Sequence, residues 1–395
     1  MRTSKISVAV AVTAALALAG CGSGGSSTSS GGGGGGKGGA INVGVITSLS
    51  GQYSVLGGFT KKTLDLLAEQ VNAAGGIGGR KVELTYADDQ TNPTQAAIAL
   101  RTLQAKNPVA IVGPVLSSSC AAIVDQVEKM QVPMVTQCAT DSQVTPVRKF
   151  TFMATLNTPG MSEQLGNYLK AQGKSNVAVL YDGGDFGKSG LAAIKQQGLL
   201  NVVDEASYQL TSTTFLPQLT GLLAKKPDAV VVWGAGAPLV TIAKEFSQLK
   251  ASAPLVFPGS AATPLFLGPA AGAGNGVIMA SSLANVVSSV PDSDPSKAVV
   301  TKLAADYKAK YNEPTSQFTA DTCGAWRVIV NALEKGGTDP KKIRDTIESS
   351  PALACHGTYQ YSPDDHRGLK TSDVKVAVDK NGTLEATPFS SGSKK

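Results

Sequence analysis

Histidine is almost absent from this chain of 395 residues, which contains only His356 and His366. A Ser-His-Asp hydrolase needs a histidine base beside its serine, and a G-x-S-x-G motif is also missing. We interpret His356, in the loop sequence "CHG", and His366, in the polar stretch "SPDDHRG", as ordinary surface or loop residues. The scarcity of histidine therefore argues against this class of enzyme.

The sequence also lacks a phosphate-binding loop and a basic run. The glycines of "GGIGGRK" (75–81) miss the G-x4-G-K-[ST] spacing and precede a strand, and "GAGNG" (272–276) is an isolated cluster. We interpret both as turns and expect no cofactor. The formal charge of +6 falls to +4 when Arg2 and Lys5 are removed, and the remaining basic residues are dispersed. This pattern gives no argument for a nucleic acid partner.

The N-terminal apolar run is too short for a membrane span. Arg2 and Lys5 precede the run from Ile6 to Ala19, whereas a spanning helix needs roughly 20 residues. The pattern is typical of a secretory signal, which we assign to residues 1–21. No later segment is long and apolar enough to span a bilayer.

The end of this signal, "LAGC", closely resembles the bacterial lipobox, which implies that Cys21 becomes a lipidated first residue. A plain secretion signal with an incidental cysteine is the alternative. Residues 22–40 are rich in glycine and serine and predict a disordered linker. Lipid and linker together predict a protein held on the outer face of the cell membrane.

The cysteines show no metal-site spacing such as C-x2-C, so we expect no metal site. Apart from Cys21, the chain contains Cys120, Cys138, Cys323 and Cys355. An even number of cysteines outside the cytoplasm indicates disulfides. We predict the pairs Cys120–Cys138 and Cys323–Cys355, because each lies within one strand–helix neighbourhood. Three pairings are possible, however, and free thiols are an alternative.

Short apolar runs such as "INVGVI", "VAIVGP", "NVAVLYD" and "DAVVVWG" each precede a helical stretch. This alternation is typical of parallel sheets with crossover helices. The predicted helices span about 57–74, 93–105, 118–130, 187–197 and 238–249. Two series of such units predict an α/β fold with two doubly wound lobes.

The polar stretch "MATLNTPG" separates the two series, and we expect the chain to return near 281–286. We expect a helical segment over 303–337, a hairpin about Asn381-Gly382 and a frayed tail over 386–395. The resulting assignment is 41–155 plus 284–366 for lobe 1 and 158–282 plus 373–385 for lobe 2.

Three hydroxyl residues, Ser117, Ser118 and Ser119, stand where the run "VAIVG" passes into a predicted helix. In open α/β sheets, ligands bind at the carboxyl ends of strands, where helices begin. Helix N-termini attract anions, and a serine there can cap the helix or hold a ligand oxygen. With no histidine base available, the segment predicts a binding site for a polar group.

Four stretches in sequence order resemble the extracytoplasmic solute-binding proteins of branched-chain amino acid (leucine/isoleucine/valine) type, which serve ABC importers. They are "INVGVITSLSGQYSVLG", "LAEQVNAAGGIGGRKVELTYADDQTNP", "VAIVGPVLSSSCAAIVDQVEKMQVPMVT" and "VAVLYDGGDFGKSGLAAIKQQG". The resemblance extends from about residue 41 to residue 379. It implies the type I periplasmic binding protein fold, in which two α/β lobes joined by three hinge crossings close over a ligand.

In lobe 1 the resemblance implies a carboxylate-binding site. Ser117 stands where the family holds the ligand carboxylate with a hydroxyl and helix N–H groups, and Ser118 follows it. A second strand end supplies Cys138, Ala139 and Thr140.

Other matches lie around the expected mouth of the cleft. Tyr53 and Leu56 occupy a loop that lines the mouth, and Phe318 matches a position that forms an apolar wall. Asp88 and Asp89 match a family "DD" pair, which we interpret as structural or hinge-side caps.

Lobe 2 departs from the family pattern. Phe186 stands where the family usually has tyrosine, and the loop around Gly236 lacks another frequent tyrosine. The loop 259–263, which includes Ser260, lacks the acid that meets the ligand ammonium in amino-acid binders. A buried ammonium without an opposite charge is costly, so the missing acid puts an α-amino acid ligand in question.

Two other residues of lobe 2 have alternative interpretations. Asp182 or Asp185 could replace the missing acid, although Asp182 reads equally well as a loop or helix cap. Trp233 is the last residue of a predicted core strand, and its ring could instead reach the cleft.

We therefore expect a lipid-anchored, monomeric solute-binding protein without enzymatic activity. It would capture a small polar solute, an amino acid or another carboxylate- or amide-bearing metabolite, and deliver it to an ABC permease. The alternative is a ligand-sensing receptor domain of the same fold that acts with a signalling partner.

Overall fold

The computed structural model describes residues 38–391. The predicted signal peptide, lipidation at Cys21, most of the predicted linker and the last four residues lie outside the described residues. In the part that is described, no helix is long and apolar enough to cross a membrane.

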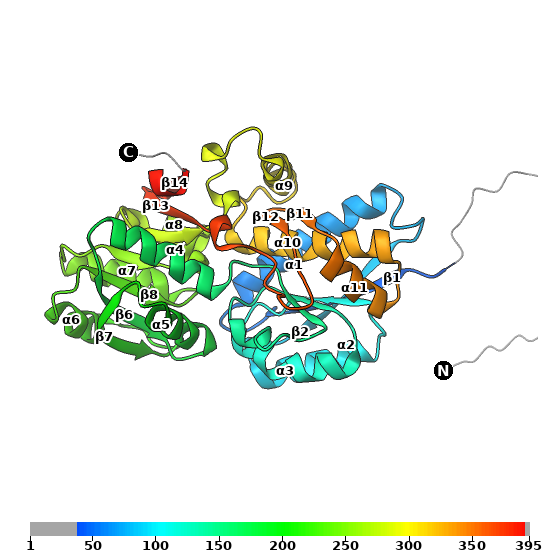
Figure 1. Cartoon of the computed structure of the whole chain (residues 1–395), viewed down its shortest axis with the longest axis horizontal. Helices are drawn as coiled ribbons and strands as arrows, with labels where there is room; N and C mark the ends of the chain where they lie inside the picture. The colour runs from blue at the N-terminus through cyan, green and yellow to red at the C-terminus, as the bar shows by residue number, and fades with distance from the viewer. Residues whose placement is uncertain (1–37, 392–395) are drawn as a thin grey trace, which may run out of the picture. The chain divides into compact units, whose positions relative to one another are not determined.

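Lobe 1, where Figure 1 labels α2, α3 and α11, is built on a parallel sheet with the strand order β2-β1-β3-β4-β5. Alternate residues of its strands face opposite layers of helices. Val43 and Val45 pack with α1 and α10, whereas Ile46 packs with α2 and α3. The strands are β1 (Ile41–Thr47), β2 (Val82–Asp88), β3 (Ala110–Val112), β4 (Met134–Thr136) and β5 (Thr151–Met153), and the helices are α1 (Ser54–Ala73), α2 (Pro93–Gln104), α3 (Ser117–Met130), α10 (Gln317–Gly336) and α11 (Pro340–Ser349).

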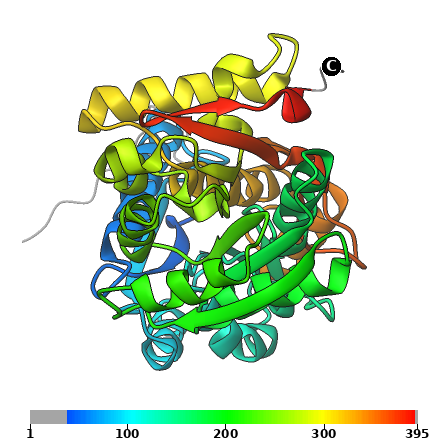
Figure 2. The same cartoon turned by 90° about the vertical axis from the view of Figure 1, so that its left-hand side faces the viewer.

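Lobe 2 is built on a seven-stranded sheet with the order β14-β13-β10-β9-β8-β6-β7. Five strands are parallel, and the C-terminal hairpin β13–β14 (red in Figure 2) adds antiparallel strands at one edge. The strands are β6 (Asn176–Asp182), β7 (Asn201–Tyr208), β8 (Ala229–Trp233), β9 (Leu255–Phe257), β10 (Ile278–Ser281), β13 (Lys375–Lys380) and β14 (Thr383–Ala386), and the helices are α4 (Thr158–Ala171), α5 (Asp185–Gln197), α6 (Leu216–Ala224), α7 (Pro238–Gln248) and α8 (Pro264–Ala270).

The chain passes between the two sheets at three places. It leaves the first sheet after β5, returns after β10 through α9 (Pro295–Tyr311) to α10, and passes again before β13. A small hairpin, β11 (Ala352–Ala354) and β12 (Gly357–Tyr359), precedes the last passage. The predicted α/β fold with two doubly wound lobes is confirmed, while the residue bounds assigned to each lobe stay a prediction.

One local expectation needs correction. The helical segment expected over 303–337 is two helices, because Asn312 has a φ of 55° and ends α9, and Ser316 caps α10. Near the C-terminus the chain forms α12 (Pro388–Ser391), and the Oγ atom of Ser390 donates a hydrogen bond to the carbonyl of Val376. The frayed tail expected over 386–395 stays a prediction. The turn at Asn381-Gly382 is confirmed.

Both predicted disulfides are present, Cys120–Cys138 and Cys323–Cys355. The first joins the start of α3 to the loop after β4, and the second joins α10 to the loop between β11 and β12. Each loop carries groups that lie near the interlobe cleft. The disulfides therefore hold together the segments that build the site.

Both histidines were expected to be surface or loop residues; both lie in loops, but neither is at the surface. His366 is buried, its ring stacks on Phe152 with centroids 4.1 Å apart, and its Nδ1 lies 2.9 Å from the carbonyl oxygen of Thr151. His356 is also buried and contacts Asp321. Polar neighbours in the sequence suggested exposure, but tertiary packing covers both rings.

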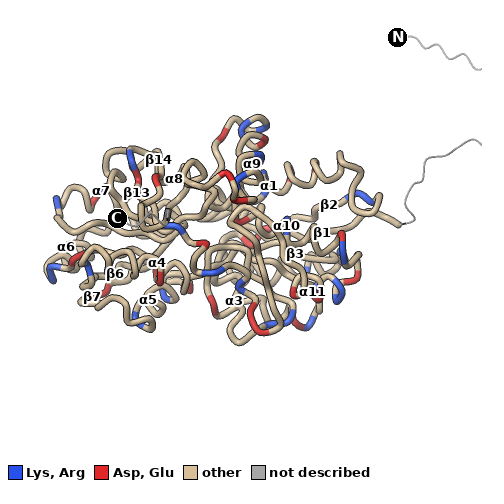
Figure 3. Tube along the Cα trace, turned by 45° about the horizontal axis from the view of Figure 1, so that its top comes forward, with Lys and Arg blue, Asp and Glu red and all other residues tan. Residues whose placement is uncertain are grey.

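Charged side chains are spread over both lobes, with basic and acidic residues interspersed (Figure 3). Most ion pairs are at the surface, such as Lys61–Asp65 and Lys302–Asp306 on single helices. Among residues 38–391, no group of three or more His, Cys, Asp or Glu side chains could hold a metal ion.

Candidate ligand-binding site

A cavity that is partly open to solvent lies between the two lobes, and the space of about 520 Å³ inside it includes open solvent. Lobe 1 contributes residues at the ends of β3 and β4 and at the start of α10, and lobe 2 contributes the starts of α4 and α5 and the loops after β8 and β9. The cavity therefore occupies the carboxyl ends of the strands, where α/β sheets bind ligands.

The walls of the cavity are largely apolar. Tyr53, Leu56 and Phe318 of lobe 1 form one buried cluster with Ala235 of lobe 2, and Phe186 packs against it. Because this cluster contains residues of both lobes, the lobes are in contact across the cleft.

Ser117 is the first residue of α3 and lines the cavity while being almost fully buried. Its hydroxyl has no hydrogen-bond partner among the described residues. The preceding residue, Leu116, does not cap the helix with its side chain. The first N–H groups of a helix have no intrahelical acceptor, so this end of α3 can bind an anionic or polar oxygen.

Six of the predicted site residues line the cavity and five do not. The lining residues are Tyr53, Ser117, Ala139, Phe186, Ser260 and Phe318. The residues that lie outside its lining are Ser118, Cys138, Thr140, Asp182 and Gly236.

Three of the residues outside the lining have other surroundings. Cys138 is buried in the disulfide with Cys120, and Thr140 is buried with its hydroxyl unpaired among the described residues. Gly236 lies against Tyr53, since a Cβ added at residue 236 would be 3.4 Å from Cε1 of the Tyr53 ring. It is therefore a contact between the lobes.

Asp182, a candidate replacement for the missing acid, does not line the cavity. Its Oδ1 accepts a hydrogen bond from the Gly184 N–H at 2.9 Å, and its Oδ2 is buried without a partner among the described residues. Burial raises the pKa of Asp182 to about 6. Burial also raises the pKa of Tyr53 and Tyr208, and the charge of Asp182 adds to both shifts. Asp182 is therefore a buried acid outside the cavity lining.

Trp233, Asp88 and Asp89 have structural roles. Trp233 is fully buried, and its indole ring packs so closely on Gly190 that no Cβ would fit there. Asp88 accepts hydrogen bonds from the backbone N–H groups of Leu49, Ser50 and Gln90, and the hydroxyl of Ser48 donates to Asp89. The two carboxylates thereby hold the loop before α1.

Sequence reasoning missed four polar residues that line the cavity: Gln137, Thr155, Gln317 and Asp321. Gln317 and Asp321 are four residues apart on α10 and therefore share one face of this helix. The sequence contains this spacing, but the spacing indicates a shared binding face only once α10 is known to face the cleft.

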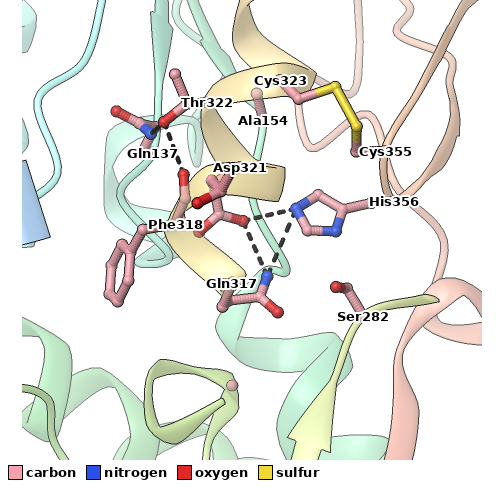
Figure 4. A network of polar contacts seen from close by, with 12 residues as sticks. Gln137, Ala154, Ser282, Gln317, Phe318, Asp321, Thr322, Cys323, Cys355 and His356 are labelled. Carbon is pink, nitrogen blue, oxygen red and sulfur yellow. Dashed lines mark hydrogen bonds and ion pairs between the residues drawn. A yellow bond between two sulfur atoms is a disulfide. The ribbon is translucent and has the colours of Figure 1, made fainter. Parts of the chain in front are cut away.

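A buried polar network includes Gln137, Gln317 and Asp321 (Figure 4). Oδ1 of Asp321 lies 2.7 Å from Nε2 of His356 and accepts a hydrogen bond from Nε2 of Gln317 at 3.0 Å. Nδ2 of Asn285 donates to Oε1 of Gln317 at 3.0 Å. Gln137 donates from Nε2 to the Thr322 hydroxyl. The network therefore joins the cavity to the second passage between the lobes, where Asn285 lies.

Two α/β lobes that enclose a cavity at their strand ends define a protein that binds a small ligand between its lobes. The chain belongs to the periplasmic binding protein family, whose sequence profile matches residues 40–382. This family membership indicates an extracytoplasmic solute-binding protein, in agreement with the resemblance described above.

Known relatives and structures agree with this assignment. The Leu/Ile/Val-binding protein BraC3 of Rhizobium johnstonii is 26% identical over 359 residues, which cover 89% of this chain and 90% of that protein. An extracellular ligand-binding receptor from Rhodopseudomonas palustris HaA2 has a TM-score of 0.82 at 23% identity and covers 88% of this chain and 99% of its own. The branched-chain amino acid transporter substrate-binding protein LivJ of Streptococcus pneumoniae, solved in complex with isoleucine, has a TM-score of 0.78 at 23% identity with the same coverages of 88% and 99%.

Proposed function

We propose that this protein captures a small polar solute, an amino acid or another carboxylate- or amide-bearing metabolite, between its lobes and delivers it to an ABC importer. Lipidation at Cys21 would keep it at the outer face of the cell membrane. The relatives support this proposal, since several are named as binding proteins for leucine, isoleucine and valine.

The observation that carries the proposal is the position of Ser117. Its unpaired hydroxyl and the start of α3 line a cavity with apolar walls between the lobes. A carboxylate would accept hydrogen bonds from the hydroxyl and from the helix N–H groups, and it would be favoured by the partial positive charge of the helix start. The apolar walls would contact the body of the solute.

Binding between the lobes would couple solute capture to lobe closure. Tyr53 of lobe 1 and Ala235 of lobe 2 belong to one buried cluster, so closure buries apolar surface as well as the solute. A solute that contacts both lobes shifts the population toward the closed form by its differential affinity for that form. We propose that this form is the one that the importer recognises.

A thermal-shift screen of the purified protein tests the function directly. The probes are amino acids, α-hydroxy acids, aromatic acids, amides and polyols. A probe that binds only the folded protein raises the melting temperature by mass action. We expect one or more carboxylate probes to do so and polyols to have no effect. The absence of any shift with the carboxylate and amide probes would contradict the proposed function.

A further inference from the structure

Asp321 presents a carboxylate to the ligand cavity from a side of the site that the family pattern does not use for an acid. It lines the cavity, its exposed fraction is only 2%, and it lies on α10 of lobe 1. Among the lining residues within 38–391 it is the single charged residue, because the others are apolar or neutral polar.

The carboxylate of Asp321 is held in place through one oxygen only. His356 and Gln317 both contact Oδ1, at 2.7 and 3.0 Å (Figure 4). Gln317 is itself fixed, since its side chain accepts from Asn285 and its backbone N–H donates to the carbonyl of Ala262 in lobe 2. Oδ2 of Asp321 has no hydrogen-bond partner in the described part of the chain. The site therefore has an oriented acceptor whose second oxygen is free.

Within the described residues, the Asp321 carboxylate contacts the side chains of His356 and Gln317, and no lysine or arginine pairs with it. The described residues that line the cavity also include no lysine or arginine. The unpaired oxygen of Asp321 thus belongs to a cavity whose lining supplies no basic side chain.

A buried carboxylate without a counter-charge is costly, and a ligand that supplies one is favoured. Among the described residues, lobe 2 supplies no acid to the cavity, since Asp182 does not line it and the loop at Gly259 and Ser260 contains none. We propose that Asp321 binds the protonated amino group of the solute, so that the solute is an amino acid whose carboxylate is held at Ser117. This inference rests on the proposed function and names the solute class within it.

The test compares probes that differ only in the amino group. L-leucine and L-phenylalanine are paired with their α-hydroxy analogues, 2-hydroxy-4-methylpentanoate and 3-phenyllactate, and affinities are measured by calorimetry on the purified protein. The wild type should bind at least one of the amino acids about tenfold or more tightly than its hydroxy analogue. Asp321→Asn should remove this preference, because the asparagine retains an acceptor for His356 but places a neutral amide where the ammonium would lie.

Asp182→Asn is the matched control, since it replaces a buried acid close to the cavity that does not line it. It should preserve the preference for the amino acids. Melting curves establish that both variants fold. If Asp321→Asn does not fold, the comparison of amino acids with hydroxy acids on the wild type can still overturn the assignment of Asp321.

The two proposals fail in different ways. A wild type that binds the hydroxy acids as tightly as the amino acids overturns the assignment of Asp321 and leaves solute binding intact. Retention of the preference in a folded Asp321→Asn protein also overturns it, as does loss of the preference in Asp182→Asn alone. Both proposals are contradicted by a protein that responds to none of these probes, to no other carboxylate and to no amide.

Discussion

His356 and Asp321 form a buried pair at the base of the interlobe cleft, with Nε2 and Oδ1 2.7 Å apart and exposed fractions of 1% and 2%. His356 follows Cys355, whose disulfide with Cys323 ties this loop to the helix that carries Asp321. The covalent bond and the polar contact therefore join the same two segments.

Removing one member of this pair should destabilise the fold. His356→Ala leaves the carboxylate of Asp321 buried with one fewer hydrogen-bond donor, and the free energy of unfolding should fall by about 1.5–3 kcal/mol. Urea denaturation measures the change. The matched control is Lys302→Ala, which breaks the surface pair with Asp306 and should cost less than about 1 kcal/mol. Equal effects of the two substitutions would contradict the role assigned to His356.

Ser117→Ala should weaken solute binding without unfolding the protein. The substitution removes a hydroxyl that lines the cavity and makes no hydrogen bond within the described residues. We expect a loss of about 1–3 kcal/mol in binding free energy, the usual cost of losing a buried polar contact. Calorimetry with a solute identified by the thermal-shift screen measures it. Ser118→Ala, one residue further along α3 and outside the cavity lining, should change the affinity little; similar losses for both variants would argue against a specific contact at Ser117.

Asp182 makes the stability depend on pH in an unusual direction for an acid. Burial raises its pKa from 3.8 to about 6, so the folded state binds this proton more tightly than the unfolded state. Stability from this group is therefore present at low pH and is lost as the pH rises from about 4 to about 6. Asp182→Asn removes the ionisation and should raise the free energy of unfolding at pH 7.5 by about 1–3 kcal/mol, with little effect at pH 4.

Denaturation curves at both pH values measure this effect of Asp182. Asp306→Asn is the comparison, because a hydrogen bond from Lys302 lowers the pKa of Asp306 and the substitution should therefore not stabilise the protein at neutral pH. An Asp182→Asn protein that is equally stabilised at pH 4 and pH 7.5 would show that ionisation is not the cause.

Cys21→Ser should release the protein from the cell membrane, if lipidation at this residue is its anchor. Fractionation of cells followed by immunodetection compares the membrane and soluble fractions. Ser23→Ala, two residues further along, should leave the protein in the membrane fraction. A Cys21→Ser protein that stays with the membrane would remove the lipid anchor from the proposed function.

The strands and helices follow from local sequence patterns. The runs around Val45 and Val179 alternate with amphipathic helices at a spacing that parallel sheets require. Both disulfides agree with the pairs that were predicted from proximity along the chain. Helix ends were harder to place, because a polar break such as Asn312–Ser316 resembles the exposed face of a continuing helix.

Ser117, at the start of α3, could be predicted as a cavity residue because strand ends and helix starts coincide in α/β sheets. Asp321 could not, since it lies inside a helix and the histidine that contacts it, His356, is 35 residues away in sequence. Asp182 lies at a strand end but does not line the cavity, so a strand end alone does not identify a cavity residue.

The sequence by itself determined the two-lobed α/β class and the position of Ser117 at a helix start, since both depend on short-range patterns. It favoured the disulfide pairs that the structure contains but left three pairings possible. Only the tertiary structure decided which charged residue lines the cavity. Burial and pairing of a carboxylate depend on segments far apart in the chain, and the folded arrangement keeps Asp182 out of the cavity lining and places Asp321 in it.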